Sequence, residues 1–271
     1  FMKEDPTFRV TTDPETGETV IAGMGELHLD VYVERMRREY KANVTVGAPK
    51  VSYREAPTVE SKYDYRHKKQ TGGSGQFAHV VGRLIPLGED ALTQYEFEDN
   101  ISGGRIPGEY IPAVDKGFQM ALKKGPVAGY EIVNCKMALD DGSYHDVDSS
   151  EMAFRIAAVE AFKQAFLASK PVLLEPIMKV EIETPTQFQG SIVGDLNSRR
   201  GMVMGAENRE SFAVIRAQVP LANMFGYATI VRSLSQGMAS FTMELASYKP
   251  VPAKIAEVII AARKKEQMAR K

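Results

Sequence analysis

The chain has 271 residues, of which 44% are hydrophobic and 25% charged, a composition typical of a globular protein with two or three domains. Its formal net charge of -1 gives no overall attraction to nucleic acid, so such a partner would have to be engaged by local basic patches. The single cysteine, Cys135, excludes an internal disulfide, and no apolar run approaches the roughly 20 residues of a membrane-spanning helix.

The N-terminal residues predict a hairpin followed by a helix. Residues 8–12 and 18–22 alternate like two strands, and the DPETGE between them contains turn formers. Apolar residues then recur with a helical period as far as Tyr40. Residues 42–46 and 50–54 are predicted strands with Gly and Pro between them, where we place the first domain boundary.

The middle residues predict a mixture of strands and helices. Helices are expected at residues 115–124 and 149–169. The predicted strands lie in VSYREA, QFAHVVGRLIPL, YEFED and EIVNCKMALD. In the second helix one apolar stripe is predicted to face the core, and it consists of Met152, Ile156, Val159, Phe162 and Phe166.

An internal repeat marks the third segment, residues 171–251. A strand, a helix ending at glycine, a methionine and another strand occur twice, with the glycines at Gly201 and Gly237. A strand-helix-strand unit used twice is typical of a ferredoxin-like βαββαβ sandwich. Thr184 and Gln187 are predicted to form a capping box at the start of the first of these helices.

The last residues predict one amphipathic helix with a basic end. Ile255, Val258 and Ile259 share a predicted face, and the segment from Arg263 to Lys271 has five basic residues against one acidic residue, a local charge of +4. Such a helix must pack on another element or fray.

The stretch GSYHDVDSSE, residues 142–151, raises the question of a metal site. A histidine and two aspartates at i, i+1 and i+3 in a turn point in different directions, which disfavours a shared metal. We predict instead that Asp148 caps the following helix, with Glu151 three residues on. Capping does not explain Tyr144 and His145, which leaves the apex of this turn as the candidate functional position.

A second candidate is KKQTGGSGQFAHV, residues 68–80. Its glycines allow close approach of a partner, and the segment from Lys62 to Arg83 has five basic residues against one acidic residue, again +4. A flexible hairpin is the plainer interpretation, but the basic residues favour RNA. The sequence GxxxxGK[ST] and the nucleophile motif GxSxG are both absent from the chain, and the four histidines are scattered, so catalysis by this chain alone is not expected.

Seven stretches together are similar to bacterial translation elongation factor G. They are FRVTTDPETGETVIAGMGELHLDVYVERMRREY, QTGGSGQFAHV, GGRIPGEYIPAVDKG, GSYHDVDSSEMAF, KPVLLEPIMKVEIETP, GDLNSRRG and MFGYATIVRSLSQG. The similarity runs nearly end to end in order and covers the carboxyl half of the family. Because the chain also begins without methionine, we expect a fragment whose GTPase domain, with its GTP and Mg, lies elsewhere.

The resemblance implies an α+β, multidomain fold. Residues 1–48 resemble part of domain III, a partial ferredoxin-like piece that we expect to be poorly ordered or to borrow a neighbour. Residues 49–170, completed by a C-terminal helix at 252–271, resemble domain IV, which is ribosomal protein S5 domain 2-like. Residues 171–251 resemble the ferredoxin-like domain V.

The resemblance also implies function and partners. The family moves tRNA and mRNA through the ribosome, so the expected partners are the ribosome (16S and 23S rRNA) and the tRNA and mRNA at its A site. A cytoplasmic monomer with no membrane contact, no metal site and no cofactor of its own is expected for this fragment.

Two groups of site residues follow from the resemblance. Those expected at the tip of domain IV, near the tRNA and the decoding centre, are Gln70, Thr71, Gly72, Gly73, Ser74, Gly75, Gln76, Ser143, Tyr144, His145 and Asp146. Those expected on a face toward the large-subunit rRNA are Arg199, Arg200, Arg232, Ser235 and Gln236. Because free carboxylates repel phosphates, Asp146 and Asp148 are predicted to turn into the loop while His145 projects.

The chain departs from the family pattern at three positions. Ser74 stands where the family usually has arginine, and Gln236 and Met238 stand where it usually has basic residues. Loss of these cations suggests a specialised paralogue, for example one that acts in ribosome recycling. A small-molecule phosphotransferase that uses the Gly-rich loop and a ribosomal protection factor are competing hypotheses, although the HDVDSSE loop disfavours the protection factor.

Overall fold

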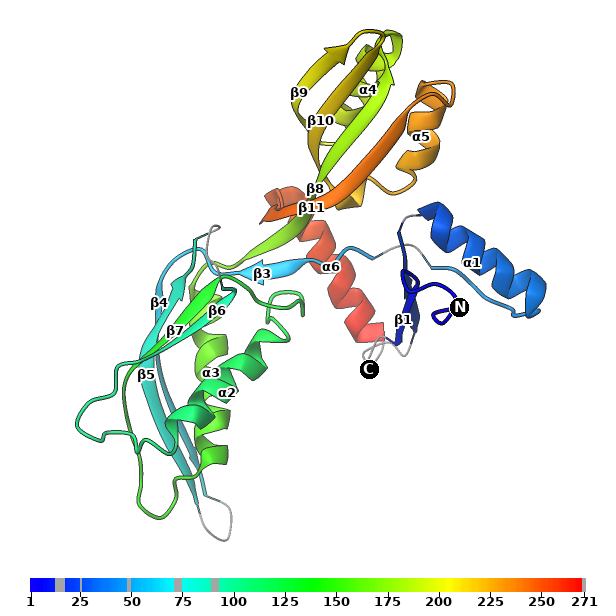
Figure 1. Ribbon diagram of the computed structural model, residues 1–271. Helices are drawn as coiled ribbons and strands as arrows, with labels where there is room; N and C mark the ends of the chain where they lie inside the picture. The colour runs from blue at the N-terminus through cyan, green and yellow to red at the C-terminus, as the bar shows by residue number, and fades with distance from the viewer. Residues whose placement is uncertain (13–17, 25, 48–49, 71–74, 89–92, 270–271) are drawn as a thin grey trace. The chain divides into compact units, whose positions relative to one another are not determined.

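The computed structural model describes residues 1–12, 18–24, 26–47, 50–70, 75–88 and 93–269 (Figure 1). The chain divides into two compact units. One unit consists of Phe1–Val51 and Ile177–Ser247, and the other of Ser52–Pro176 and Tyr248–Lys271.

The N-terminal hairpin and helix predicted from the sequence are confirmed. Strand β1 (Arg9–Thr12) pairs antiparallel with β2 (Thr19–Ala22), and helix α1 spans Glu26–Glu39. The strand predicted at 42–46 is wrong, and of the one predicted at 50–54 only Arg54 lies in a strand of the described residues. Alternation alone does not form a strand, because the backbone groups also need a neighbouring strand to bond.

The N-terminal turn and α1 share a small aromatic core. Phe8, which is 1% exposed, stacks on Tyr32 with ring centroids 4.2 Å apart. Phe1 meets the edge of Tyr32 at 5.0 Å. These rings pack the N-terminal turn against α1.

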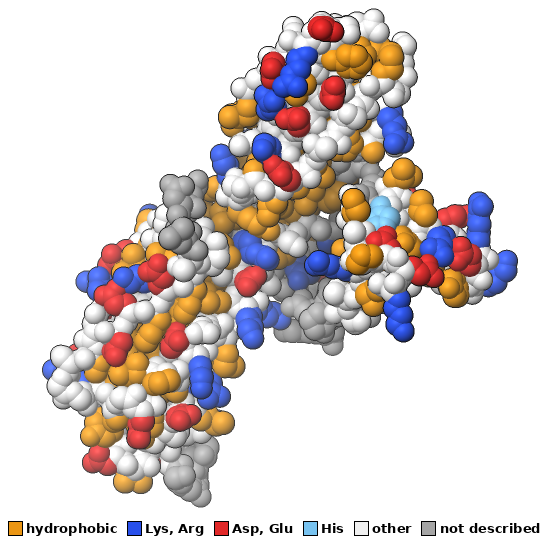
Figure 2. Space-filling view, viewed as in Figure 1, with side chains coloured by type: hydrophobic (Ala, Val, Ile, Leu, Met, Phe, Trp, Pro, Cys, Tyr) orange, Lys and Arg blue, Asp and Glu red, His pale blue; other side chains and the backbone are white. Residues whose placement is uncertain are grey.

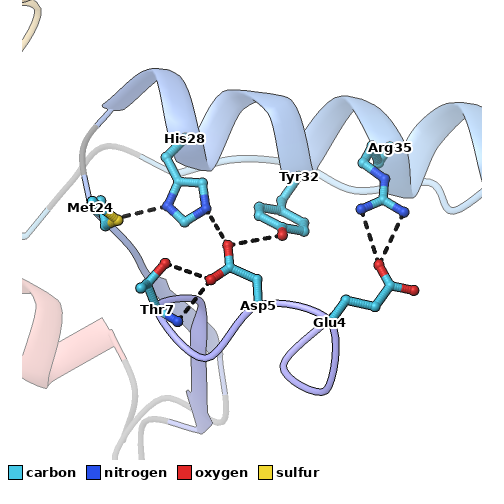
Figure 3. Close-up of polar contacts among 7 residues, drawn as sticks. All are labelled: Glu4, Asp5, Thr7, Met24, His28, Tyr32 and Arg35. Atoms are coloured by element: carbon cyan, nitrogen blue, oxygen red, sulfur yellow. Dashed lines mark hydrogen bonds and ion pairs between the residues drawn. The ribbon is translucent and has the colours of Figure 1, made fainter.

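A partly buried carboxylate, Asp5, fastens the same turn to α1 (Figure 3). Its Oδ1 accepts hydrogen bonds from the Thr7 N–H at 2.8 Å and the Thr7 hydroxyl at 2.6 Å. Its Oδ2 accepts from the Tyr32 hydroxyl at 3.0 Å and lies 2.7 Å from His28 Nε2. His28 Nδ1 accepts the Met24 N–H, so both ring nitrogens are engaged and His28 serves structure here.

The Asp5 cluster gives the first testable prediction, which concerns acid. The Thr7 hydrogen bonds, aided by His28 and Tyr32, hold the pKa of Asp5 well below its usual range. A lowered folded-state pKa contributes stability that is present above the unfolded value of about 3.9 and is lost as the pH falls through the folded value. Near-ultraviolet circular dichroism of the tyrosines should therefore decline in acid, and Asp5→Asn should remove that part of the transition. The exposed neighbour on α1, Asp30→Asn, is the control, and equal pH profiles for the two variants would contradict the assignment.

The second unit is built on a four-stranded sheet. Pairing is antiparallel between β4 and β5 and between β5 and β7, and parallel between β6 and β7. The strands in spatial order are β4 (Ser61–Lys69), β5 (Gln76–Pro86), β7 (Cys135–Ser143) and β6 (Tyr95–Asp99). Helices α2 (Ile111–Leu122) and α3 (Glu151–Ala168) share one core with the inward side chains of the sheet.

Two sequence interpretations change in this unit. Strand β4 is absent from the sequence prediction, because polar Ser61 and His67 occupy inward positions and hide its alternation. In α3 the predicted stripe is only partly right, since Met152 is 60% and Ile156 37% exposed while Phe162 and Phe166 are buried. The buried face instead contains Ala153, Phe154, Ala157, Ala158, Ala161, Phe162, Ala165 and Phe166.

Small residues let α2 and α3 approach closely. A Cβ added at Gly117 of α2 would lie 2.6 Å from the Ala158 Cβ of α3. Alanine carries little hydrophobicity in a pattern, yet here it is the residue that fits between two helices. Figure 1 shows the two helices side by side on the sheet.

The ferredoxin-like prediction for the C-terminal segment is confirmed. Its sheet has the order β11-β8-β10-β9, which is the 4-1-3-2 order of a βαββαβ sandwich. The pairings of β10 with β8 and with β9 are antiparallel. The elements are β8 (Val172–Pro185), α4 (Gln189–Ser198), β9 (Met202–Arg209), β10 (Phe212–Pro220), α5 (Tyr227–Leu234) and β11 (Ser240–Pro250).

The internal repeat is visible in how the two helices end. The Gly201 N–H donates to the Leu196 carbonyl, and the Gly237 N–H donates to the Arg232 carbonyl, each five residues back. The residue before each glycine, Arg200 or Gln236, has a positive φ, as a Schellman ending requires. The capping box predicted at Thr184 is wrong, because β8 continues through Pro185 and the helix has no side-chain cap.

A buried glutamate ties β3 (Arg54–Ala56) to the loop after α2. The Glu55 carboxylate accepts N–H groups of Val127 at 3.1 Å, Ala128 at 2.8 Å and Tyr130 at 3.1 Å. Burial raises the pKa of Glu55, and these N–H groups oppose that rise.

The C-terminal helix α6 (Ala253–Ala269) contacts the same loop. The Gln267 side chain donates to the Ala128 carbonyl at 3.2 Å, and the Arg263 guanidinium lies 5.3 Å from the centre of the Tyr130 ring. Val258 is 68% exposed, so the predicted packing face is wrong at this position. None of the helices in the described residues is long and apolar enough to cross a membrane.

Candidate functional site

Two segments far apart in sequence meet at one end of the β4–β5–β7 sheet. They are residues 75–77 at the start of β5, which we call the hairpin end, and the connection from β7 to α3. The Phe77 N–H donates to the Asp148 carbonyl at 2.8 Å, and the Ser149 hydroxyl donates to the Phe77 carbonyl at 2.8 Å. The Gly75 N–H donates to Asp148 Oδ1 at 3.1 Å. The structure therefore brings together the two stretches that sequence analysis singled out.

Asp148 has a different role from the predicted helix cap. The cap of α3 is Ser150, whose hydroxyl accepts the Ala153 N–H at 3.2 Å. The Asp148 carboxylate instead fills the space beside Gly75, where an added Cβ would lie 2.9 Å from its Cγ. The capping-box spacing fits Asp148 with Glu151, but the helix begins two residues later and the Asp148 carboxylate accepts the Gly75 N–H instead.

His145 projects from this junction, as predicted. Its side chain is 56% exposed. Its Nδ1 accepts the N–H groups of Val147 and Asp148, both at 3.3 Å, and lies 3.6 Å from Asp148 Oδ2. Because Nδ1 is the acceptor, the neutral ring carries its proton on Nε2, which gives the apex a hydrogen-bond donor.

The carboxylate next to His145 does not turn inward. Asp146 is exposed, so the prediction that both acids face the loop holds for Asp148 and is wrong for Asp146. Tyr144 is 42% and Val147 76% exposed, which makes the apex a mixed surface of ring, alkyl and carboxylate groups.

The remaining predicted tip residues are less prominent. Ser143 Oγ lies 3.1 Å from His79 Nδ1, and Gln76 Oε1 lies 3.0 Å from His67 Nε2, so both side chains are engaged on the strands. Gln70 is exposed at the end of β4. Four of the predicted residues lie outside the described part of the chain, namely Thr71, Gly72, Gly73 and Ser74.

A metal-binding arrangement is not found among the described residues. Within that part of the chain no group of three His, Cys, Asp or Glu side chains is placed to hold a metal ion. His79 Nε2 lies 2.7 Å from Asp64 Oδ1, which with the Ser143 contact occupies both of its nitrogens. Burial raises the pKa of Cys135 to about 12, so its thiol stays protonated and unreactive at neutral pH.

The second predicted group, on the ferredoxin-like domain, lies at the ends of α4 and α5. Arg199 at the end of α4 donates to Asp195 Oδ2 at 2.7 Å and to the Asn223 carbonyl at 2.8 Å, and it lies over the Tyr227 ring that begins α5. Arg232 and Gln236 lie at the other end of α5, which is about 12 Å long.

Within that group Ser235 requires a correction. It is fully buried, accepts the Ala239 N–H at 3.0 Å and donates to the Val231 carbonyl at 2.7 Å. Its hydroxyl therefore stabilises the end of α5, and its side chain is not accessible to a partner. The exposed members are Arg200, Arg232 and Gln236.

Three family models match consecutive parts of the chain. Their descriptions are Elongation Factor G, domain III, for residues 1–48, Elongation factor G, domain IV, for residues 49–170, and Elongation factor G C-terminus for residues 172–259.

Curated relatives and a solved structure give the same picture. A protein named Elongation factor G from Rhodopirellula baltica is 57% identical over 269 residues, 99% of this chain and 39% of that protein. One named Elongation factor G 1 from Desulfotalea psychrophila is 54% identical over 98% of this chain and 38% of that protein. A crystal structure of a Thermus thermophilus protein has a TM-score of 0.86 and 39% identity, covering 97% of this chain and 39% of its own. The chain therefore spans well under half the length of the relatives it matches.

Proposed function

The chain belongs to the elongation factor G family of translation factors, and from this premise we propose that it is the ribosome-contacting part of a longer GTPase that moves tRNA and mRNA during protein synthesis. In this proposal the GTP and Mg are bound by a part of the longer protein outside this chain. Its place of action is the cytoplasm, where it works as a monomer on the ribosome.

The junction of the two loops carries the proposal. Asp148 and Ser149 hold the hairpin end against the β7–α3 connection, and His145 stands exposed on that base. A protrusion that enters a groove of RNA needs a fixed base and a donor at its end, because single-stranded bases are recognised by hydrogen bonds to their edges and by stacking. We propose that His145, with Tyr144 beside it, contacts the tRNA and mRNA in the A site, while Arg200, Arg232 and Gln236 approach large-subunit rRNA.

The charge of the apex limits how it can approach RNA. Asp146 is exposed, so it would repel a phosphate placed directly against it. We therefore propose that the apex meets base edges and ribose hydroxyls, which the His145 Nε2–H can reach, and that phosphates lie to the side.

The competing hypotheses have less support. The relatives at 54% to 57% identity are named Elongation factor G, which does not favour a phosphotransferase or a recycling specialist. Gln236 and Met238 are exposed, as a loss of RNA-facing cations would require, while Ser74 lies outside the described residues.

A substitution at the apex tests the proposal. In the full-length protein, His145→Ala is expected to slow translocation by about tenfold or more while ribosome-dependent GTP hydrolysis is retained, since a stacking or base-edge contact contributes about 1–3 kcal/mol. Rapid kinetics of mRNA movement measures the first rate and phosphate release the second. Val147→Ala is the matched control, because it trims an exposed side chain at the same apex and keeps the N–H that bonds His145. Translocation at the normal rate in His145→Ala would remove this residue from the site.

A further inference from the structure

Strand β4 presents three cations on one side of the sheet. Lys62, Arg66 and Lys68 are exposed and alternate with inward Tyr63 and Tyr65, so they share the face that α2 and α3 do not cover. We call these three residues the β4 cation strip. Strand β4 is at the edge of the sheet, so the strip has no neighbouring strand on one side. Figure 2 shows that basic and acidic side chains are interspersed over the visible face of the molecule.

The strip differs from the other cations on the same face in having no acidic partner among the described residues. Arg83 on β5 donates to Asp140 at 2.8 Å, and Lys136 on β7 pairs with Glu98 on β6. The acid within β4, Asp64, lies 2.7 Å from His79 Nε2. The basic side chains of β5 and β7 are thus paired with acids, whereas those of the β4 cation strip are not. The chain as a whole has a net charge of -1.

The spacing of the strip suits a nucleic-acid backbone. Lys62 and Lys68 are six residues apart, which is about 20 Å along a strand. A strip of this length can contact several successive phosphates of one RNA strand. The strand ends at Lys69 and leads directly into the hairpin that meets the His145 loop.

We propose that the β4 cation strip binds the phosphate backbone of an RNA strand that runs beside the protrusion while His145 contacts bases at its end. The proposal rests on the proposed function. The exposed Asp146 would repel phosphates at the apex, so the phosphate contacts are assigned to the β4 cation strip instead. Arg66 supplies a fork for two phosphate oxygens, and the two lysines act as flanking point charges.

Charged edge strands have another common explanation, which is protection against pairing with a second chain. Protection works with charge of either sign, whereas phosphate binding requires positive charge. The two explanations therefore make different predictions for neutral and acidic substitutions of the same residues.

The test compares two triple variants of the full-length protein that change charge equally. One carries Lys62→Gln, Arg66→Gln and Lys68→Gln. The control carries Lys116→Gln, Lys123→Gln and Lys163→Gln, which are exposed on the helix side of the same unit. Binding to programmed ribosomes is measured between about 50 and 200 mM salt. Loss of three single-strand phosphate contacts should lower the slope of log affinity against log salt by about 2, which is about 20-fold less change over this range.

Each outcome decides the proposal. A smaller slope in the β4 variant alone supports it, and Lys62→Glu, Arg66→Glu and Lys68→Glu should then weaken binding further while the protein stays monomeric. An unchanged slope, or an equal fall in the helix-side control, overturns it. If the triple variant folds poorly, Arg66→Gln alone should still lower the slope by about 0.7. Normal binding by the strip variants together with slow translocation in His145→Ala would reject the strip and keep the proposed function.

Discussion

Replacing Asp148 by alanine is expected to slow translocation by the full-length protein at least as much as His145→Ala does. The Asp148 carboxylate accepts the Gly75 N–H and lies 3.6 Å from His145 Nδ1, so its removal releases the hairpin end and the ring together. A hydrogen bond to a charged group contributes about 1.5–3 kcal/mol, which is about tenfold or more if the tip must be ordered to act. The carbonyl of residue 148 still accepts the Phe77 N–H, so the two segments should loosen and not separate.

Two variants separate positioning from a simple loss of negative charge. Asp148→Asn keeps an oxygen that can accept the Gly75 N–H, so it should recover much of the rate. Asp146→Ala removes the neighbouring exposed carboxylate and should have little effect. Thermal unfolding should be nearly unchanged in all three, because the junction lies at the end of the sheet. A normal rate in Asp148→Ala, or an Asn variant as slow as the Ala variant, would contradict the positioning role.

The elements that the sequence predicts well are those in which polarity alternates with burial. Strand β5 and the second half of β8 have this pattern. Strands β9 and β11 are mostly exposed, and the internal repeat predicts them instead. Strand β4 is not predicted because charged residues occupy its exposed face and polar Ser61 and His67 occupy two of its inward positions. The buried face of α3 is misplaced for a related reason, since hydrophobicity ranks Met and Ile above the alanines that close helix packing selects.

The site is predictable in location and not in its internal bonds. A turn with an aromatic and an imidazole ahead of a helix start identifies His145 from local residues alone. The Asp148 to Gly75 bond joins residues 73 positions apart, and nothing in either local pattern indicates the other. Ser235 shows the converse, because a serine near the end of a helix resembles a surface residue until its hydroxyl is seen to satisfy the Val231 carbonyl and the Ala239 N–H.

Replacing Glu55 by alanine is expected to destabilise the unit that contains β4 to β7 by about 3 kcal/mol or more. Three N–H groups, of Val127, Ala128 and Tyr130, would lose their acceptor in a buried loop, and each unsatisfied donor costs about 1–3 kcal/mol. The same loop holds Gln267 of α6, so the helix end should fray as well. Hydrogen exchange of residues 125–133 and thermal unfolding measure the two effects. Glu131→Ala is the control, because that carboxylate is exposed and pairs across the surface with Arg54.

The pH dependence of the same residue should have the sign opposite to that of Asp5. Burial raises the pKa of Glu55 above its unfolded value of about 4.3, so its contribution to stability is complete below that value and declines as the pH rises through the folded value. Because the protonated acid still offers oxygens to the loop, the wild type should lose stability in this unit as the pH rises above the unfolded value. Glu55→Gln, which cannot ionise, should be flatter over that range. Parallel pH profiles for the two proteins would mean that the loop N–H groups outweigh burial and that the carboxylate is held charged.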